Sequence, residues 1–208
     1  MPIRIDYQRI VSQSSLQRRA GGRGRPKDTF LIVCEGEETE PNYFKAFRLS
    51  SARVWVHGLG FNTDSLVEEV IKEKKKAANS GMKFDQIWCV LDKDSFPSQN
   101  LNRALQLAKN NNIRVAYSNQ SFELWYLLHF DYLDAALSRT RYIEKLTAYL
   151  GKRYQKNSNE MYKIILGKQA AAIRNAEKLL SNYHPPNPDQ NDPSTTVHKL
   201  VIELNKFL

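Results

Sequence analysis

The chain has 208 residues, of which 41% are hydrophobic and 25% are charged. These proportions are those of a soluble globular protein, and they exclude a wholly disordered chain, a collagen-like chain and a small disulfide scaffold. A domain of this size can bury enough apolar surface to fold without a disulfide or a structural metal. The 31 Lys and Arg residues outnumber the 22 Asp and Glu residues, and this positive charge favours polyanionic partners such as nucleic acid.

The positive charge is concentrated at the start of the chain. Residues 1–28 hold seven basic and two acidic side chains, within a stretch rich in Arg and Gly that has no apolar periodicity. Such a segment buries too little surface to offset its ordering entropy, so it predicts a flexible basic arm. The arm's expected nucleic-acid contacts are Arg18, Arg19, Arg23, Arg25 and Lys27. A solubilising tail without a partner is the alternative.

Two cysteines, Cys34 and Cys89, each lie within a run of large apolar residues. A free thiol in such a setting behaves as a small buried hydrophobe, which indicates a reducing compartment. The sequence contains no apolar run of about 18 residues and no apolar core of a secretory signal at its start. We therefore expect a cytoplasmic protein.

Strand and helix patterns alternate from residue 30 onward. Apolar runs predict strands at 30–34, 53–57, 86–91 and 113–117, and the segments between them have helical periodicity with plausible first-turn residues at Pro41, Ser65 and Ser98. This order predicts an α/β domain with a central, mostly parallel sheet and flanking helices. After residue 122 the patterns are helical only. We expect the core to span 29–135 and a C-terminal helical extension to span 136–208.

Acidic side chains follow the first and third predicted strands. Glu35 comes directly after the first strand, and Asp92 and Asp94 come after the third. The carboxyl ends of parallel strands meet at one edge of a sheet, where function usually gathers. Three carboxylates at this edge would supply hard oxygen ligands suited to Mg²⁺ or Mn²⁺. By itself an Asp-x-Asp pair is more often turn chemistry or a solvated edge.

Four further residues could complete this site. Asn119 and Glu123 follow the fourth strand, Glu40 belongs to an acidic run at the start of a predicted helix, and Lys93 lies between the two aspartates. An acid in the first helical turn also has a simpler reading, because the helix dipole favours it there. Lys93 could contact a phosphate or be a solvated surface lysine.

Four blocks of sequence carry a resemblance to a known family. EGEETEPNYF (35–44), WCVLDKD (88–94), SNQSFELWYLLHF (118–130) and PSTTVHKLV (193–201) resemble the RloB-like family, which is linked to restriction loci. That family is similar to Toprim domains, the catalytic fold of topoisomerases, primases and certain nucleases. Toprim proteins bind Mg²⁺ between a Glu after the first strand and an Asp-x-Asp after the third, and Glu35, Asp92 and Asp94 match these positions.

The resemblance implies a function that composition and spacing do not reach. It implies a Toprim-like sheet and a metal-dependent nuclease that cuts RNA, tRNA among the candidates, or DNA in defence against phage. It also implies an ABC- or AAA-type partner ATPase encoded nearby, and it leaves a homodimer open. The alternatives are a non-catalytic module that binds an ATPase or nucleic acid, and a sensor whose arm recognises a phage polyanion.

Overall fold

A five-stranded sheet forms the centre of the molecule. The computed structural model describes residues 28–58, 63–93 and 98–208. The strands are β1 (Asp28–Cys34), β2 (Ala52–Gly58), β3 (Gln86–Asp92), β4 (Arg114–Asn119) and β5 (Ser194–Thr195), in the order β2-β1-β3-β4-β5. The first four strands are parallel, and β5 pairs antiparallel with the end of β4. The expected mostly parallel α/β sheet is thus confirmed.

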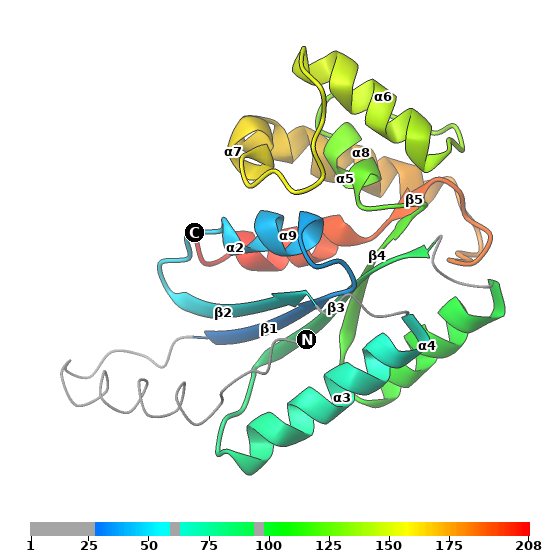
Figure 1. Ribbon diagram of the computed structural model, residues 1–208. Helices are drawn as coiled ribbons and strands as arrows, with labels where there is room; N and C mark the ends of the chain where they lie inside the picture. Colours follow the sequence, from blue (N-terminus) through cyan, green and yellow to red (C-terminus); the bar gives the residue numbers. More distant parts are fainter. Residues whose placement is uncertain (1–27, 59–62, 94–97) are drawn as a thin grey trace.

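Helices cover both faces of the sheet (Figure 1). One face carries α3 (Thr63–Asn79) and α4 (Ser98–Asn110), while α2 (Thr39–Lys45) and α9 (Val197–Asn205) lie against the other. Beyond α2 and α9 comes a further helical layer of α5 (Glu123–Leu127), α6 (Arg139–Leu150), α7 (Met161–Ile165) and α8 (Gln169–Ser181). A short 3-10 helix, Leu166–Lys168, connects α7 to α8.

Alternate residues of β1 point to the two faces, as strand geometry requires. Phe30 and Ile32 join a large core with the aromatic residues of α2 and α5, whereas Leu31 and Val33 join a second core with α3 and α4. All four are fully buried. The continuous apolar run of this strand therefore reflects burial on both sides, which is typical of a central parallel strand.

The two cysteines are buried free thiols in different cores. Cys34 faces the α2 side and Cys89 the α3 side, so the sheet separates them. Burial raises the pKa of both thiols above the ordinary value. They act as packing residues, as expected from the sequence.

The C-terminal segment contributes to the sheet itself. β5 extends the sheet beyond β4, α9 packs on one face, and the Ser50 amide donates to the Phe207 carbonyl at 2.8 Å.

The boundary between 29–135 and 136–208 stays a prediction. The basic arm is also untested, because residues 1–27 lie outside the described ranges. Across the described ranges, no helix is both long and apolar enough to cross a membrane.

Candidate functional site

An acidic cleft opens at the carboxyl ends of β1 and β3. These strands are neighbours in the sheet, so the residues that follow them meet at one edge. The cleft is lined by Glu35, Gly36, Glu37, Glu38, Thr39, Glu40, Asp92, Phe122, Glu123, Arg139 and Lys156. Six of these eleven side chains are carboxylates, and the only cations in this lining are one Arg and one Lys. We call this set the acidic cleft.

Glu35 and Asp92 are joined across the strand ends. The Glu35 amide donates to the Val90 carbonyl at 2.9 Å, which continues the β1–β3 pairing by one residue. The Asp92 amide then donates to Glu35 Oε2 at 3.1 Å. Arg139 Nη2 donates to Asp92 Oδ2 at 3.1 Å. A backbone amide of the sheet thus holds the Glu35 carboxylate, and the Arg139 side chain holds that of Asp92.

Glu40 is buried in the first turn of α2, with its carboxylate directly against Gly36. A Cβ atom at position 36 would overlap that carboxylate, so any other residue there would displace the end of the Glu40 side chain. The pKa of Glu40 is raised to about 7: burial is the largest cause, the negative charges of Glu123 and Glu35 act in the same direction, and hydrogen bonds from backbone amides oppose the shift. Glu40 therefore titrates near neutral pH. Sequence reasoning placed this acid at a helix start, which is confirmed, but its burial was not predicted.

Glu123 enters the cleft from the first residue of α5 and is almost fully buried. Ser121 Oγ donates to its Oε2 at 2.6 Å, and the Tyr154 hydroxyl donates to its Oε1 at 3.2 Å. Lys156 Nζ lies 3.9 Å from the same Oε1. The partners of this carboxylate thus come from two separate segments, the residues before α5 and the loop after α6, as expected of a buried charge that must be satisfied.

Other predicted site residues lie elsewhere. Asn119 is buried at the end of β4, where its Nδ2 donates to the Asn191 carbonyl at 2.8 Å, so its side chain ties the sheet to the loop before β5 instead of lining the cleft. Lys93 directly follows β3 and does not line the cleft either. Asp94 and the five basic residues of the arm lie outside the described ranges, so their roles stay predictions.

Arg139 and Lys156 were not predicted from the sequence. They belong to the helical extension, at the start of α6 and in the loop after it. No local motif distinguishes these two residues from the other 29 Lys and Arg residues of the chain. Only the tertiary structure brings them to the sheet edge.

The donor chemistry of the cleft suits a divalent cation. Glu35 and Asp92 are hard oxygen ligands of the kind that Mg²⁺ and Mn²⁺ prefer. Among residues 28–58, 63–93 and 98–208, however, no group of three or more His, Cys, Asp or Glu side chains is arranged to hold a metal ion. The described part of the chain thus supplies two of the three expected ligands, and Asp94 is the third.

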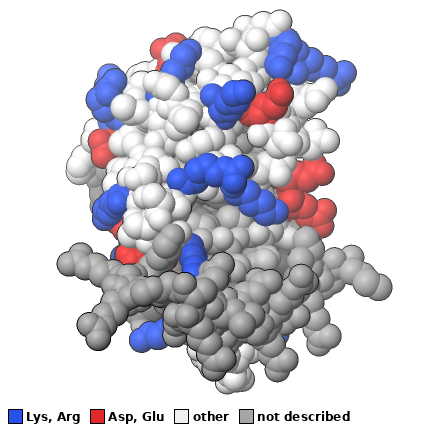
Figure 2. Space-filling model, turned by 90° about the vertical axis from the view of Figure 1, so that its left-hand side faces the viewer, with Lys and Arg blue, Asp and Glu red and all other residues white. Residues whose placement is uncertain are grey.

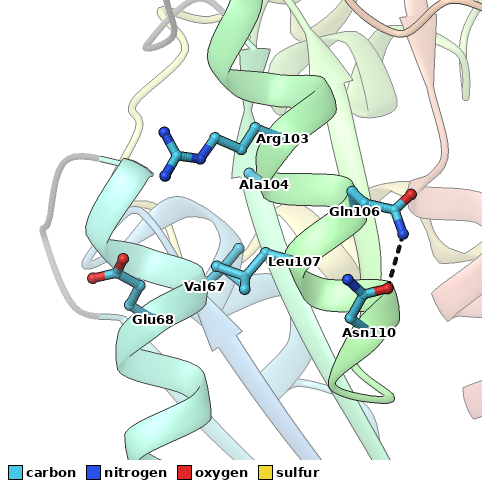
Figure 3. Close-up of a pocket in the computed structure, with 7 residues that line it drawn as sticks. All are labelled: Val67, Glu68, Arg103, Ala104, Gln106, Leu107 and Asn110. Carbon is cyan, nitrogen blue, oxygen red and sulfur yellow. Dashed lines mark hydrogen bonds between the residues drawn. The ribbon is translucent and has the colours of Figure 1, made fainter.

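A second hollow lies between α3 and α4, on the opposite face of the sheet (Figure 3). Val67 and Glu68 of α3 face residues of α4 across it, and Gln106 Nε2 donates to Asn110 Oδ1 at 2.8 Å along its side. Its charged lining residues are Glu68 and Arg103. This hollow lacks the paired carboxylates of the acidic cleft, so the cleft is the stronger candidate site.

Comparison with known proteins gives one match. The family model described as RloB-like protein matches residues 30–204. No match is found among curated proteins or among solved structures. The matched range includes most of β1 and all of β3, whose carboxyl ends meet at the acidic cleft, and extends almost to the end of α9. The chain therefore belongs to the RloB-like family.

Proposed function

We propose that this chain is a metal-dependent nuclease that hydrolyses phosphodiester bonds in RNA, tRNA among the candidates, or in DNA. One observation carries the proposal. Glu35 follows β1, Asp92 ends the adjacent parallel strand β3, and the Asp92 amide donates a hydrogen bond to the Glu35 carboxylate. Two carboxylates brought together at a sheet edge can supply oxygen ligands for a metal-assisted reaction.

The residues that would hold Mg²⁺ or Mn²⁺ are Glu35, Asp92 and Asp94. When bound, the ion supplies electrostatic stabilisation for the charge that develops on the transferring phosphoryl group. Glu35 has a second role open to it, as the general base that takes a proton from the attacking water. The resemblance to Toprim proteins supports this assignment residue by residue.

The test is a cleavage assay on cellular RNA and DNA with Mg²⁺ or Mn²⁺. Asp92→Asn and Glu35→Gln keep the shape of each side chain but remove its charge, so each should lower the cleavage rate by roughly 100-fold or more. Glu177→Gln is the matched control, because Glu177 is an exposed carboxylate on α8 that does not line the cleft. Equal rates for all three variants would show that the site is wrongly assigned.

We also propose that this nuclease acts in defence against phage and that a partner ATPase controls it. The support is the resemblance of the four sequence blocks. A phage-challenge assay with the chain alone, with its neighbouring ATPase gene and with both genes tests the pairing. Protection that needs both genes and is lost in Asp92→Asn fits the proposal, whereas protection by the chain alone contradicts control by an ATPase.

A non-catalytic binding module is the second candidate. The observation that favours it is the ion pair of Arg139 with Asp92, which engages an expected metal ligand. Such a module should tolerate Asp94→Asn in the phage-challenge assay, because the fold and the surface charge change little. A nuclease should lose its protection.

A further inference from the structure

The two cations of the acidic cleft come from the helical layer, not from the sheet. Arg139 is the first residue of α6, after Ser138, whose Oγ accepts from the Arg141 amide. Its side chain is 38% exposed while it pairs with Asp92. Arg139 therefore reaches the floor of the cleft and still faces solvent.

Lys156 is held over the cleft by a well-anchored loop between α6 and α7. Its backbone carbonyl accepts from Thr39 Oγ1 at 2.9 Å, and the next carbonyl, that of Asn157, accepts from Asn42 Nδ2 at 3.2 Å. Both donors belong to α2. Tyr154, two residues earlier, is buried and bonds Glu123. These contacts fix the backbone, while the Lys156 side chain remains 48% exposed.

Each cation has a carboxylate partner that it could exchange for a phosphate. The pairs Arg139–Asp92 and Lys156–Glu123 each join a partly exposed cation to a more buried acid. Glu123 keeps its hydrogen bonds from Ser121 and Tyr154 when Lys156 turns to a phosphate, so its buried charge stays satisfied. A guanidinium binds a phosphate through two parallel N–H bonds, and an ammonium binds it as a point charge.

A polyanion cannot enter a cleft of six carboxylates without cations to meet it. Figure 2 shows Lys and Arg side chains scattered among uncharged residues on the visible described face, with Asp and Glu between them, and no continuous basic surface there. Arg139 and Lys156, in contrast, lie in the lining of the cleft itself. Within the described lining, the positive side-chain charge beside the carboxylates thus comes from these two residues.

We propose that Arg139 and Lys156 bind the backbone phosphates of a nucleic acid at the cleft, by exchanging their carboxylate partners for phosphate oxygens. This inference rests on the proposed function and adds the substrate-binding residues to it. It assigns α6 and the α6–α7 loop to substrate positioning, so the helical extension forms one wall of the site.

The test measures binding separately from cleavage. The probes are fluorescein-labelled single-stranded RNA and DNA of one sequence with phosphorothioate linkages, which carry the backbone charge and resist hydrolysis. Affinity is measured by fluorescence anisotropy in constant Mg²⁺ over a range of salt, with the full chain. Arg139→Gln and Lys156→Gln should each weaken binding and lower the slope of log affinity against log salt by about 0.7. The probe that shows these changes identifies the nucleic acid.

Two variants serve as matched controls. Arg141→Gln removes an exposed, ion-paired Arg two residues further along α6, and Lys152→Gln removes an exposed, ion-paired Lys from the same loop as Lys156. Neither residue lines the cleft. Both controls should keep the slope of the unmodified chain, and Arg139→Lys should keep that slope because it keeps the charge.

Three outcomes would overturn the inference. The unmodified chain binds neither probe, or Arg139→Gln and Lys156→Gln give the same salt slopes as the two controls. In the third outcome, these two variants lose thermal stability but keep the salt slope of the unmodified chain. The last result would show that the cations only neutralise Asp92 and Glu123. Failure of the proposed function is distinguishable, because the unmodified chain would then bind with the expected slopes but not cleave an ordinary phosphodiester substrate.

Discussion

The two faces of the sheet are covered in different ways. On the α3–α4 face the core is largely aliphatic, with Leu66, Val70 and Leu101 fully buried, and these two helices contribute one buried charged side chain, Glu73, within the described residues. The opposite face has a large aromatic core. It also contains most of the described buried polar side chains, among them Glu40, Ser121, Glu123, His129, Gln169 and His198.

The two faces therefore have different roles: the α3–α4 face serves packing, and the opposite face also contributes to the acidic cleft. Amphipathic α3 and α4 need only an apolar stripe to cover their face of the sheet. The helices of the other face must also satisfy buried acids, each of which costs free energy unless it is bonded or protonated. The acidic cleft draws Glu40 and Glu123 from that side. Substitutions on the two faces should therefore differ in kind, in the ways that follow.

The largest expected effect is on the aromatic side. Trp125 is fully buried on α5 and packs edge-on against Tyr43 and His129. Trp125→Ala should lower the free energy of unfolding by about 4 kcal/mol, since it removes a large buried ring. Because Glu123 of α5 accepts from Tyr154 in the loop that carries Lys156, this variant should displace Lys156 and bind the oligonucleotide probes more weakly. Urea unfolding and anisotropy measure the two effects.

Leu101→Ala on α4 is the matched substitution on the other face. Leu101 is equally buried, so its loss should cost about 3 kcal/mol. It should leave probe binding unchanged at temperatures where the variant is folded. If Leu101→Ala weakened binding as much as Trp125→Ala, the functional contrast between the faces would be lost.

Glu40 gives the next largest effect, through pH. Its folded pKa of about 7 lies above the usual 4.5 of a glutamate, so protonation favours the folded state, and stability is lost as pH rises from about 4.5 to 7. Linkage gives a loss of roughly 3 kcal/mol over this range. Glu40→Gln mimics the protonated form, so it should be more stable than the unmodified chain at pH 8 and similar at pH 4.

Urea unfolding in EDTA across this pH range measures that effect. Glu73→Gln on α3 is the control, because the Glu73 carboxylate has an ion pair with Lys76 to lose and its removal should bring no gain at pH 8. If the difference in the free energy of unfolding between Glu40→Gln and the unmodified chain did not change with pH, the raised pKa of Glu40 would be contradicted.

Sequence patterns predicted the four parallel strands, the helices α2, α3 and α4 between them, and helical structure after residue 122, because periodic runs report burial directly. They also placed Glu35 and Asp92 at one sheet edge. They did not predict β5, which has two residues, or α7, which has five. Segments this short contain too few residues to show a period.

The walls of the cleft could not be predicted for a different reason. Arg139 meets Asp92 across 47 positions of sequence, and Tyr154 meets Glu123 across 31. Such contacts depend on how the helical layer packs on the sheet, which no local pattern encodes. Asn119 shows the converse: its place at a strand end predicted a site residue, but the antiparallel β5 and the loop before it engage its amide.

Ser121 gives a smaller expected effect on the aromatic side. Its hydroxyl donates to the buried Glu123 carboxylate at 2.6 Å, so Ser121→Ala leaves that charge short of one donor and should cost about 2 kcal/mol. Ser80→Ala, at the end of α3, removes an exposed bond to the Lys76 carbonyl and should change stability by at most about 0.5 kcal/mol. Thermal unfolding compares them, and equal losses would show that burial of Glu123 does not govern the cost.

The smallest expected effect is on the outer surface of the α3–α4 face. Glu69 pairs with Lys72 and Lys76 on α3, and its side chain is 23% exposed. Glu69→Gln should cost about 0.5 kcal/mol at low salt, the usual worth of such helix pairs. The loss should vanish near 1 M salt, where the screening length falls to about 3 Å. A loss that is larger, or that persists at high salt, would mean that this face also depends on charges shielded from solvent, and the division between a packing face and a chemical face would fail.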